Sequence, residues 1–124
     1  MSQSPTGSSA WKGLLTEDAR TALAGVLEPR ERVLLVAPAV GSTLVLTGRR
    51  LVVVRDGASF RPKTGVRAFG ISRGLGVRIG PARRRVIIES DGRAITVFIR
   101  PEQLELAEAL VAELRRRILK TLQE

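Results

Sequence analysis

The residue type in this sequence best suited to binding a ligand is arginine, and it is concentrated in the middle of the chain. The protein has 21 Lys and Arg residues against 12 Asp and Glu residues, which gives a net charge of +9. Residues 41–100 contain thirteen of the basic residues but only three of the acidic ones, whereas the segments on either side are nearly neutral. Because a planar guanidinium binds two oxygen atoms of a phosphate or carboxylate at once, this pattern is typical of proteins with an anionic partner.

The basic residues of this segment fall into two groups. The first group is the candidate anion-binding site, and it comprises Arg49, Arg50, Arg55, Arg61, Lys63, Arg67, Arg73 and Arg78. The second group is the run Arg83, Arg84 and Arg85. If the segment forms an antiparallel sheet, several residues of the first group line one exposed face, because alternate side chains of a strand share a face.

Four interpretations of this basic surface stay open. The arginines can reflect a GC-rich genome and form an ordinary solvated face, or they can contact an anionic lipid surface, where each basic residue contributes about 1 kcal/mol. They can also bind an acidic protein partner or take part in homo-oligomeric assembly through a sheet edge. Nucleic acid is the least favoured partner, because three Phe and one Trp residue offer little surface for base stacking.

The residue types that usually carry out catalysis are scarce. The sequence has no His, Cys or Tyr, which removes the commonest general base, the thiolate nucleophile and the usual zinc ligands. The acidic residues of the segment 41–100 are Asp56, Glu89 and Asp91. Asp91 is explained by a turn and Glu89 by a solvated strand face. We therefore expect a protein that is not an enzyme, with no catalytic residue, no metal and no cofactor.

Glycines punctuate residues 70–80 in a way that invites comparison with a phosphate-binding loop. The spacing is not Gly-x-Gly-x-x-Gly, no Gly-Lys-Ser/Thr follows, and the next segment has the pattern of a strand rather than a helix. We interpret these glycines as bends in a strongly curved sheet.

The elements that position the arginines can be predicted from hydrophobic periodicity and turn residues. Residues 1–12 form a flexible, Ser-rich tail, and residues 13–124 form one domain. Thr16 is the expected N-cap of a short amphipathic helix that ends near Leu27, because Pro29 cannot continue it. Short strands are then expected at residues 32–37, 43–47, 50–55, 59–61, 66–71, 75–79, 86–90 and 93–99.

Two turns between these strands carry specific expectations. Gly48 separates two apolar runs and is expected to adopt a positive φ. Asp91-Gly92 predicts a two-residue hairpin in which Ser90 pairs with Arg93. This register sets Ile88 opposite Ile95 and Val86 opposite Val97 on a core face, with Ile87 opposite Thr96 and Arg85 opposite Phe98 on the other face.

The last segment predicts a helix that caps the sheet. Pro101 opens it at a position where the missing N–H is tolerated. Its apolar stripe comprises Leu104, Ala107, Leu110, Val111, Leu114, Ile118 and Leu122. Because the stripe spans only about three heptads, docking on the sheet is favoured over a coiled coil.

Two motifs resemble the bacterial pleckstrin-homology-like (PH-like) domain family. Residues 29–34 (PRERVL) are similar to the family's start of the first strand, and residues 47–51 (TGRRL) are similar to its turn between the second and third strands, with Gly48 where Asp or Asn is usual. The resemblance covers about residues 14–122. It implies a mainly β fold with helices: a curved seven-stranded antiparallel sheet or barrel, a short N-terminal helix and a C-terminal capping helix.

The same resemblance implies a binding module rather than a particular ligand. PH-like domains bind lipid headgroups or peptides, or serve in assembly. The lipid-binding members carry basic residues in the loop between the first two strands, whereas residues 37–42 of this chain carry no charge. This difference counts against a phosphoinositide site.

The sequence also predicts the cellular location. There is no cysteine, no apolar run approaches the roughly 20 residues that span a bilayer, and the N-terminal residues lack the apolar core of a secretory signal. We expect a cytoplasmic protein, peripheral at the membrane if the basic surface contacts anionic lipids.

Overall fold

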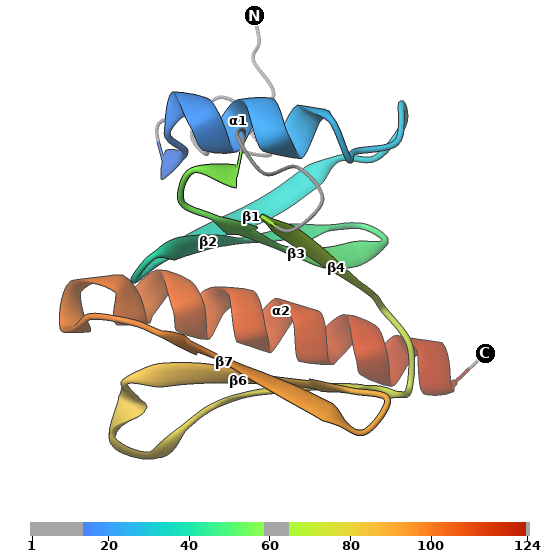
Figure 1. Ribbon diagram of the computed structural model, residues 1–124. Coiled ribbons are helices and arrows are strands. Elements are labelled where there is room, and N and C mark those ends of the chain that lie inside the picture. Colours follow the sequence, from blue (N-terminus) through green and yellow to red (C-terminus); the bar gives the residue numbers. More distant parts are fainter. Residues whose placement is uncertain (1–13, 59–64, 124) are drawn as a thin grey trace, which may run out of the picture.

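The computed structural model describes residues 14–58 and 65–123 and shows a mainly β fold with two α-helices (Figure 1). Seven strands form two antiparallel sheets, one of four strands and one of three. The helices and strands are α1 (Glu17–Ala24), β1 (Val33–Ala39), β2 (Ser42–Thr47), β3 (Arg50–Arg55), β4 (Val66–Gly70), β5 (Leu75–Ile79), β6 (Arg85–Ser90), β7 (Arg93–Phe98) and α2 (Leu104–Leu122).

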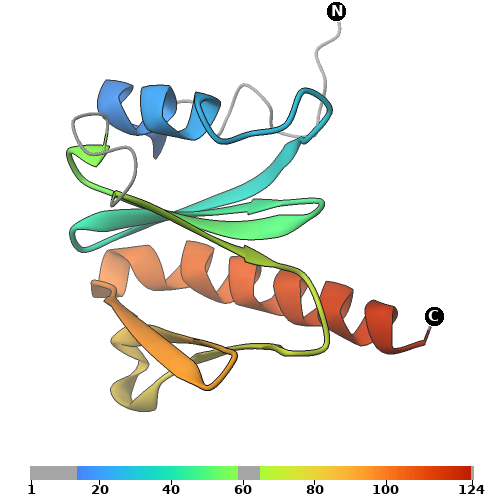
Figure 2. The ribbon, with the colours of Figure 1, turned by 45° about the vertical axis from the view of Figure 1, so that its right-hand side comes forward.

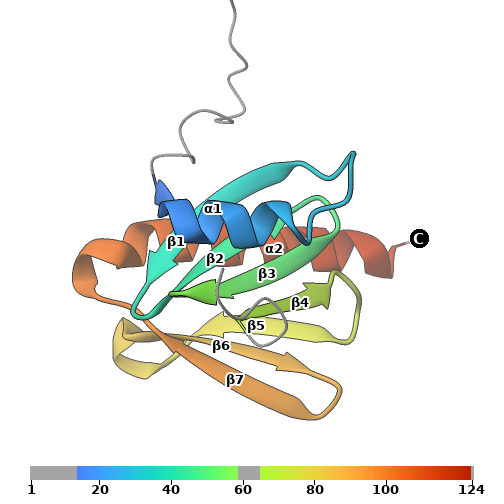
Figure 3. The same ribbon diagram turned by 45° about the horizontal axis from the view of Figure 1, so that its top comes forward.

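The expectation of one continuous seven-stranded sheet or closed barrel is wrong for the described residues. The strands pair in the order β1-β2-β3-β4 and β5-β6-β7, and β4 does not pair with β5. The turn after Ile71, closed by a 3.1 Å hydrogen bond from Leu75 N to Ser72 O, joins neighbouring ends of β4 and β5 (Figure 3), and the second sheet lies below the first (Figure 1). Stacking buries the apolar inner faces of both sheets together with α2 in one core, which favours two stacked sheets over a flat extension.

The larger core lies between the two sheets and is completed by α2. Figure 2 shows α2 lying between the sheets, where it packs against β1 and β5. The stripe predicted for this helix is confirmed at its centre, where Ala107, Leu110, Val111 and Leu114 are buried, whereas Leu122 in the last turn is 52% exposed. The buried members contact inner-face residues such as Leu44 and Leu46 of β2 and Val77 of β5 in one cluster.

The second core lies on the opposite face of the four-stranded sheet, under α1. The N-cap is confirmed, since Thr16 Oγ1 accepts a 3.1 Å hydrogen bond from Ala19 N. The helix proper ends at Ala24, and a hydrogen bond from Leu27 N to Leu23 O extends its last turn to the predicted limit. Leu15 and Leu23 pack on outward-facing strand residues, so the central strand β2 is buried along its whole length.

The described strands agree closely with the predicted ones, and the Asp91-Gly92 hairpin register is confirmed at every predicted pair. Asp91 and Gly92 have φ values of 54° and 77°. Val86 and Ile88 are almost fully buried, as expected of the aliphatic face. The predicted strand at 59–61 and the tail at 1–12 lie outside the described residues.

The prediction for Gly48 is wrong, because its φ is not positive. The Thr47 side chain closes this turn instead. Its Oγ1 accepts hydrogen bonds from Arg49 N at 3.1 Å and from Arg50 N at 3.0 Å, so the turn needs no left-handed residue.

None of the helices in the described part of the chain is both long enough and apolar enough to cross a membrane.

Candidate functional site: an arginine-lined cleft between two strand edges

The sandwich has two long sides, and among residues 14–58 and 65–123 a helix covers one of them. On one side α2 packs against β1 and β5. On the other side β4 and β7 are the outermost strands of their sheets and face each other across the opening (Figures 1 and 2). Two adjoining hollows of about 240 and 540 Å³ lie along this opening, and both are lined by Arg67 and Ile95. We call this opening the β4–β7 cleft.

The strand register explains why arginines enter the cleft. In β3, Leu51 and Val53 point into the core between the sheets, and Arg55 follows on the same face. In β4, Arg67 pairs with Val53, so its side chain also points to the inner face. Because this end of the sandwich is not covered by α2, Arg55 and Arg67 stay exposed while they line the same hollow.

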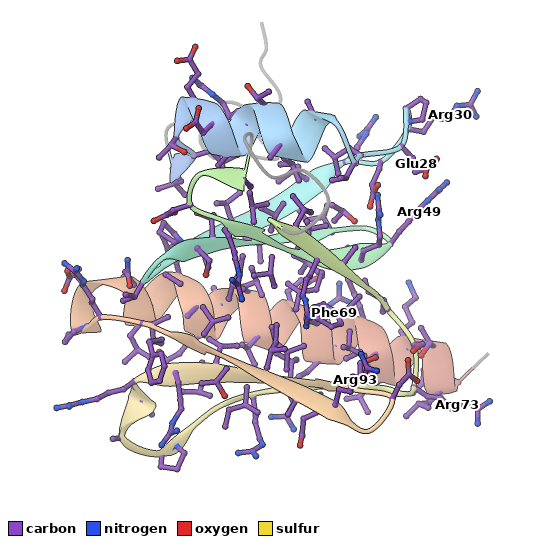
Figure 4. All side chains as sticks on the ribbon, in the orientation of Figure 1. Glu28, Arg30, Arg49, Phe69, Arg73 and Arg93 are labelled. Carbon is purple, nitrogen blue, oxygen red and sulfur yellow. The ribbon has the colours of Figure 1, made fainter. Side chains whose placement is uncertain are left out.

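A third arginine comes from the other sheet. Arg93 begins β7 directly after the Asp91-Gly92 turn and lines the larger hollow together with Phe69 of β4. Figure 4 shows Phe69 and Arg93 between the two sheets, on the side of the molecule where the cleft opens. Three arginines from β3, β4 and β7 therefore reach one cleft whose walls are otherwise largely apolar.

The electrostatic balance of the cleft is strongly positive. Asp91 is the one carboxylate among the described residues that line either hollow. The ion pairs of the described residues involve other arginines, namely Arg50, Arg83, Arg116 and Arg117. Arg55, Arg67 and Arg93 are exposed, so water and salt screen their attraction for an anion, but three guanidinium groups against one carboxylate still suit the cleft to a phosphate or carboxylate group.

Free backbone groups of β4 add to the binding capacity of the cleft. Arg55 N donates to Gly65 O at 2.7 Å and Ile71 N donates to Arg49 O at 2.9 Å. In an antiparallel ladder every second residue of β4 bonds to β3, and these two bonds show which alternate residues of β4 those are. Within the described residues, the remaining N–H and C=O groups point away from β3, and they belong to Val66, Ala68 and Gly70.

The edge of β7 also carries outward-facing backbone groups. Ile99 N donates to Arg84 O at 2.9 Å, so Ala94, Thr96 and Phe98 direct their backbone groups away from β6. Phe98 O is already occupied, because it accepts a 2.8 Å hydrogen bond from Val40 N in the β1–β2 turn. This bond ties the two sheets together at one end of the cleft.

The predicted anion-binding residues do not gather on one face. Of the six that the structure describes, Arg55 and Arg67 line the same hollow. Arg73 lies in the β4–β5 turn and Arg78 on the exposed face of β5, while Arg61 and Lys63 lie outside the described residues. Arg93, which the sequence analysis did not select, also lines the cleft. Its position directly after a hairpin turn, at the start of an edge strand, is the feature of the sequence that could have indicated it.

Arg49 belongs to a second, separate basic corner. A hollow of about 310 Å³ is lined by Arg49 together with Arg30 and Arg32, two arginines that the sequence analysis did not select. Figure 4 shows Arg30 and Arg49 at the same corner of the molecule. Arg117 also lines it, but its guanidinium donates to Glu113 at 2.8 Å. Leu34 is the one large apolar residue among the described residues that line this corner.

Arg50 has a structural role. Its guanidinium donates to both carboxylate oxygens of Glu31, at 2.6 and 2.9 Å, and to Val26 O at 2.7 Å. The Thr47 hydroxyl donates to the same carboxylate at 2.6 Å. The Glu31 side chain is completely buried, and its hydrogen bonds with Arg50, supported by Thr47, lower the pKa of this carboxyl to about 2 although burial opposes the shift.

This network joins the two sequence motifs described above. Glu31 belongs to the segment at the start of β1, while Thr47 and Arg50 belong to the turn between β2 and β3. A buried carboxylate that accepts a bidentate guanidinium is a strong and geometrically demanding contact. The motif residues thus fix the position of the α1–β1 connection on the sheet and leave the cleft arginines free.

The fold and the cleft define the chain as a small β-sandwich with a helix between its sheets on one side and a basic opening on the other. Among residues 14–58 and 65–123, no three acidic side chains come together in a group that could hold a metal ion. No family model, curated protein or solved structure matches this chain. The cleft geometry is therefore the basis for the functional conclusion.

Proposed function

We propose that this chain is a non-catalytic binding module of the PH-like kind that binds an anionic ligand in the β4–β7 cleft. The observation that carries the proposal is the convergence of Arg55, Arg67 and Arg93 on one opening with apolar walls. The PH-like assignment is supported by the order of the elements, with a terminal helix packed between two sheets, and by the Glu31–Arg50 contact between the two motif segments.

The shape of the site favours a ligand group that enters the opening over a flat charged surface. The three arginines come from two sheets and are separated by apolar residues such as Phe69 and Ile95. A lipid bilayer meets exposed residues on one convex face, whereas a phosphate or carboxylate group can enter between the sheets and contact both of them. We therefore favour such a group over a membrane surface as the ligand.

A second candidate function, protein interaction, is supported by the free edge of β4. Extended segments bind such edges through backbone hydrogen bonds, and side chains at alternate positions then provide specificity. Because this edge borders the same arginines, anion binding and protein interaction would use the same site. The identity of the ligand distinguishes the two functions.

The proposal is tested by titrating the protein with tripolyphosphate by NMR or calorimetry across a salt series. A variant with Arg55→Gln, Arg67→Gln and Arg93→Gln is compared with a control that loses the same charge elsewhere, Arg20→Gln, Arg73→Gln and Arg78→Gln. We expect the cleft variant to bind at least tenfold more weakly and the control to change by less than about threefold.

Equal losses in the two variants would show attraction by net charge alone and would reject a cleft site. The same pair of variants is tested for sedimentation with anionic and neutral vesicles and for a gel shift with random duplex DNA. Binding of anionic vesicles or duplex that is lost only in the control variant would place the anion-binding surface outside the cleft and overturn the proposal.

A further inference from the structure

We infer that the occupant of the cleft is an extended acidic segment of another protein, which adds a fifth strand to the β1–β4 sheet along the edge of β4. The inference rests on the proposed anion-binding function and names its ligand class. It requires two independent properties of β4: a backbone edge with which no other segment of the described chain pairs, and arginines placed to select acidic side chains.

The two edges of the four-stranded sheet differ in how well they can accept a strand. At one edge, β1 carries Pro38, has a register irregularity between Val33 and Leu35, and packs against α2. Proline, irregular pairing and coverage are the features that protect natural edge strands. At the other edge, β4 pairs with β3 without a register shift and has small, exposed residues at Ala68 and Gly70.

The direction of the backbone groups favours strand addition. Val66, Ala68 and Gly70 each present an N–H and a C=O group on the free side of β4. A strand placed there continues the existing hydrogen-bond ladder and has no bulky side chain to displace at its centre. The small side chains and the direction of the backbone groups therefore both favour strand addition at this edge.

The arginines determine which strand is accepted. In an added strand, alternate side chains face the interior of the sandwich and lie beside Arg67, with Arg55 and Arg93 on either side. Acidic residues at positions i, i+2 and i+4 would place their carboxylates there. The intervening side chains would lie beside Val66, Ala68 and Gly70 and need to be small or apolar.

A second copy of the same chain is a poor occupant. Pairing of β4 with another β4 would bring two sets of Arg55, Arg67 and Arg93 to one seam, and like charges on neighbouring strands are destabilising. A flat lipid surface would satisfy the arginines but not the backbone groups. An extended acidic segment satisfies both.

The inference is tested with synthetic peptides of eight residues and blocked ends. One peptide alternates Glu with Thr, and a second has the same composition with four Glu followed by four Thr. Two further versions of the alternating peptide carry N-methyl groups on one or the other set of alternate amides, which removes the corresponding donors without changing the charge.

We expect the alternating peptide to bind at least tenfold more tightly than the block peptide. One set of N-methyl groups should weaken binding at least tenfold and the other by less than about threefold, because the amides of a strand point alternately toward and away from its neighbour. The sensitive set then reports whether the added strand runs parallel or antiparallel to β4.

Two protein variants test whether the peptide pairs with the edge of β4 or with that of β7. Ala68→Pro removes an outward N–H of β4, and the matched control Ala94→Pro removes an outward N–H of β7, so neither breaks an internal ladder bond. We expect Ala68→Pro to weaken the alternating peptide at least tenfold and Ala94→Pro to leave it within about threefold. Amide spectra show whether each variant is folded; if Ala68→Pro is not, the N-methyl comparison decides.

The outcomes separate the inference from the function on which it rests. If tripolyphosphate binds the unaltered protein in the cleft but block and alternating peptides bind equally and N-methyl groups have no effect, strand addition is rejected and anion binding stands. If neither tripolyphosphate nor any peptide binds, the proposed function fails as well. Vesicle binding that depends on the cleft arginines and exceeds peptide binding would also overturn the inference.

Discussion

The two long sides of this sandwich are built from the same kind of strands but are completed in opposite ways. On the side between β1 and β5, α2 contributes buried residues such as Leu110 and Leu114 to the core. On the side between β4 and β7, the described residues include no covering helix, and arginines line the opening. Burying apolar side chains stabilises a fold, whereas three unpaired like charges do not. The difference shows that one side is completed by the core of the fold, and it is the reason why we place the proposed binding site on the other.

The largest expected effect comes from weakening the closed side. Leu114→Ala should lower the free energy of unfolding by about 3 kcal/mol, because Leu114 is fully buried and the substitution leaves a cavity. Leu119→Ala on the same helix is the control; Leu119 is 60% exposed, and its loss should cost no more than about 0.5 kcal/mol. Urea denaturation of both variants measures the difference, and similar losses would show that α2 does not close the core.

The next prediction concerns the pH dependence of stability, which should involve the structural Arg50 through Glu31 but not the cleft arginines. The pKa of Glu31 is lowered from 4.5 to about 2 in the folded protein, so its contribution is fully present above pH 4.5 and is lost as the pH falls toward 2. This change corresponds to on the order of 3 kcal/mol. Glu31→Gln should remove most of this pH dependence, whereas the triple cleft variant should retain it. Unfolding measured between pH 2 and pH 6 tests the pattern, and an unchanged slope in Glu31→Gln would contradict it.

A smaller effect concerns the hairpin that borders the open side. Gly92 has a φ of 77°, where a side chain is strained, so Gly92→Ala should cost about 1 kcal/mol. Gly48→Ala is the matched control, because Gly48 lies outside this region and an added Cβ would meet nothing within 4 Å. Thermal unfolding of the two variants should show a lower Tm only for Gly92→Ala; equal shifts would indicate that the Thr47 turn also needs a glycine.

The smallest effect is expected on the open side itself. Replacing Arg55, Arg67 and Arg93 with Gln should leave the free energy of unfolding within about 0.5 kcal/mol, or raise it slightly at low salt, because like charges are removed. Denaturation at low and high salt measures this. A loss above about 2 kcal/mol would mean that these arginines hold the sheets together, and the contrast between the two sides would fail.

Local features of the fold could be predicted well from the sequence. The Asp91-Gly92 hairpin, the Thr16 N-cap and the central stripe of α2 depend on residues close together in the chain, and each is present as expected. The division into two sheets was missed, because the choice between pairing β5 with β4 and stacking it below depends on the packing of the whole core. Such long-range preferences are not carried by strand periodicity.

The candidate site was only partly predictable for the same reason. Arg49 and Arg50 are neighbours with the same side chain, yet Arg50 is bound to Glu31, nineteen residues earlier, while Arg49 is exposed. Arg55 and Arg67 are two of the eight residues in the predicted group, and they line one hollow because they lie on adjacent strands and point to the same face. Arg93 belongs to the other sheet, so its approach to them follows from the stacking that the sequence did not reveal.

The two sheets are tied together at both ends of the cleft. Beside the β1–β2 turn, Val40 N donates to Phe98 O at 2.8 Å. At the other end the chain itself joins the sheets, because β4 ends at Gly70 and β5 begins at Leu75, which pairs with Ser90 next to the Asp91-Gly92 hairpin. A segment bound along β4 would therefore lie between two tethers, and their separation would limit how many of its residues can pair.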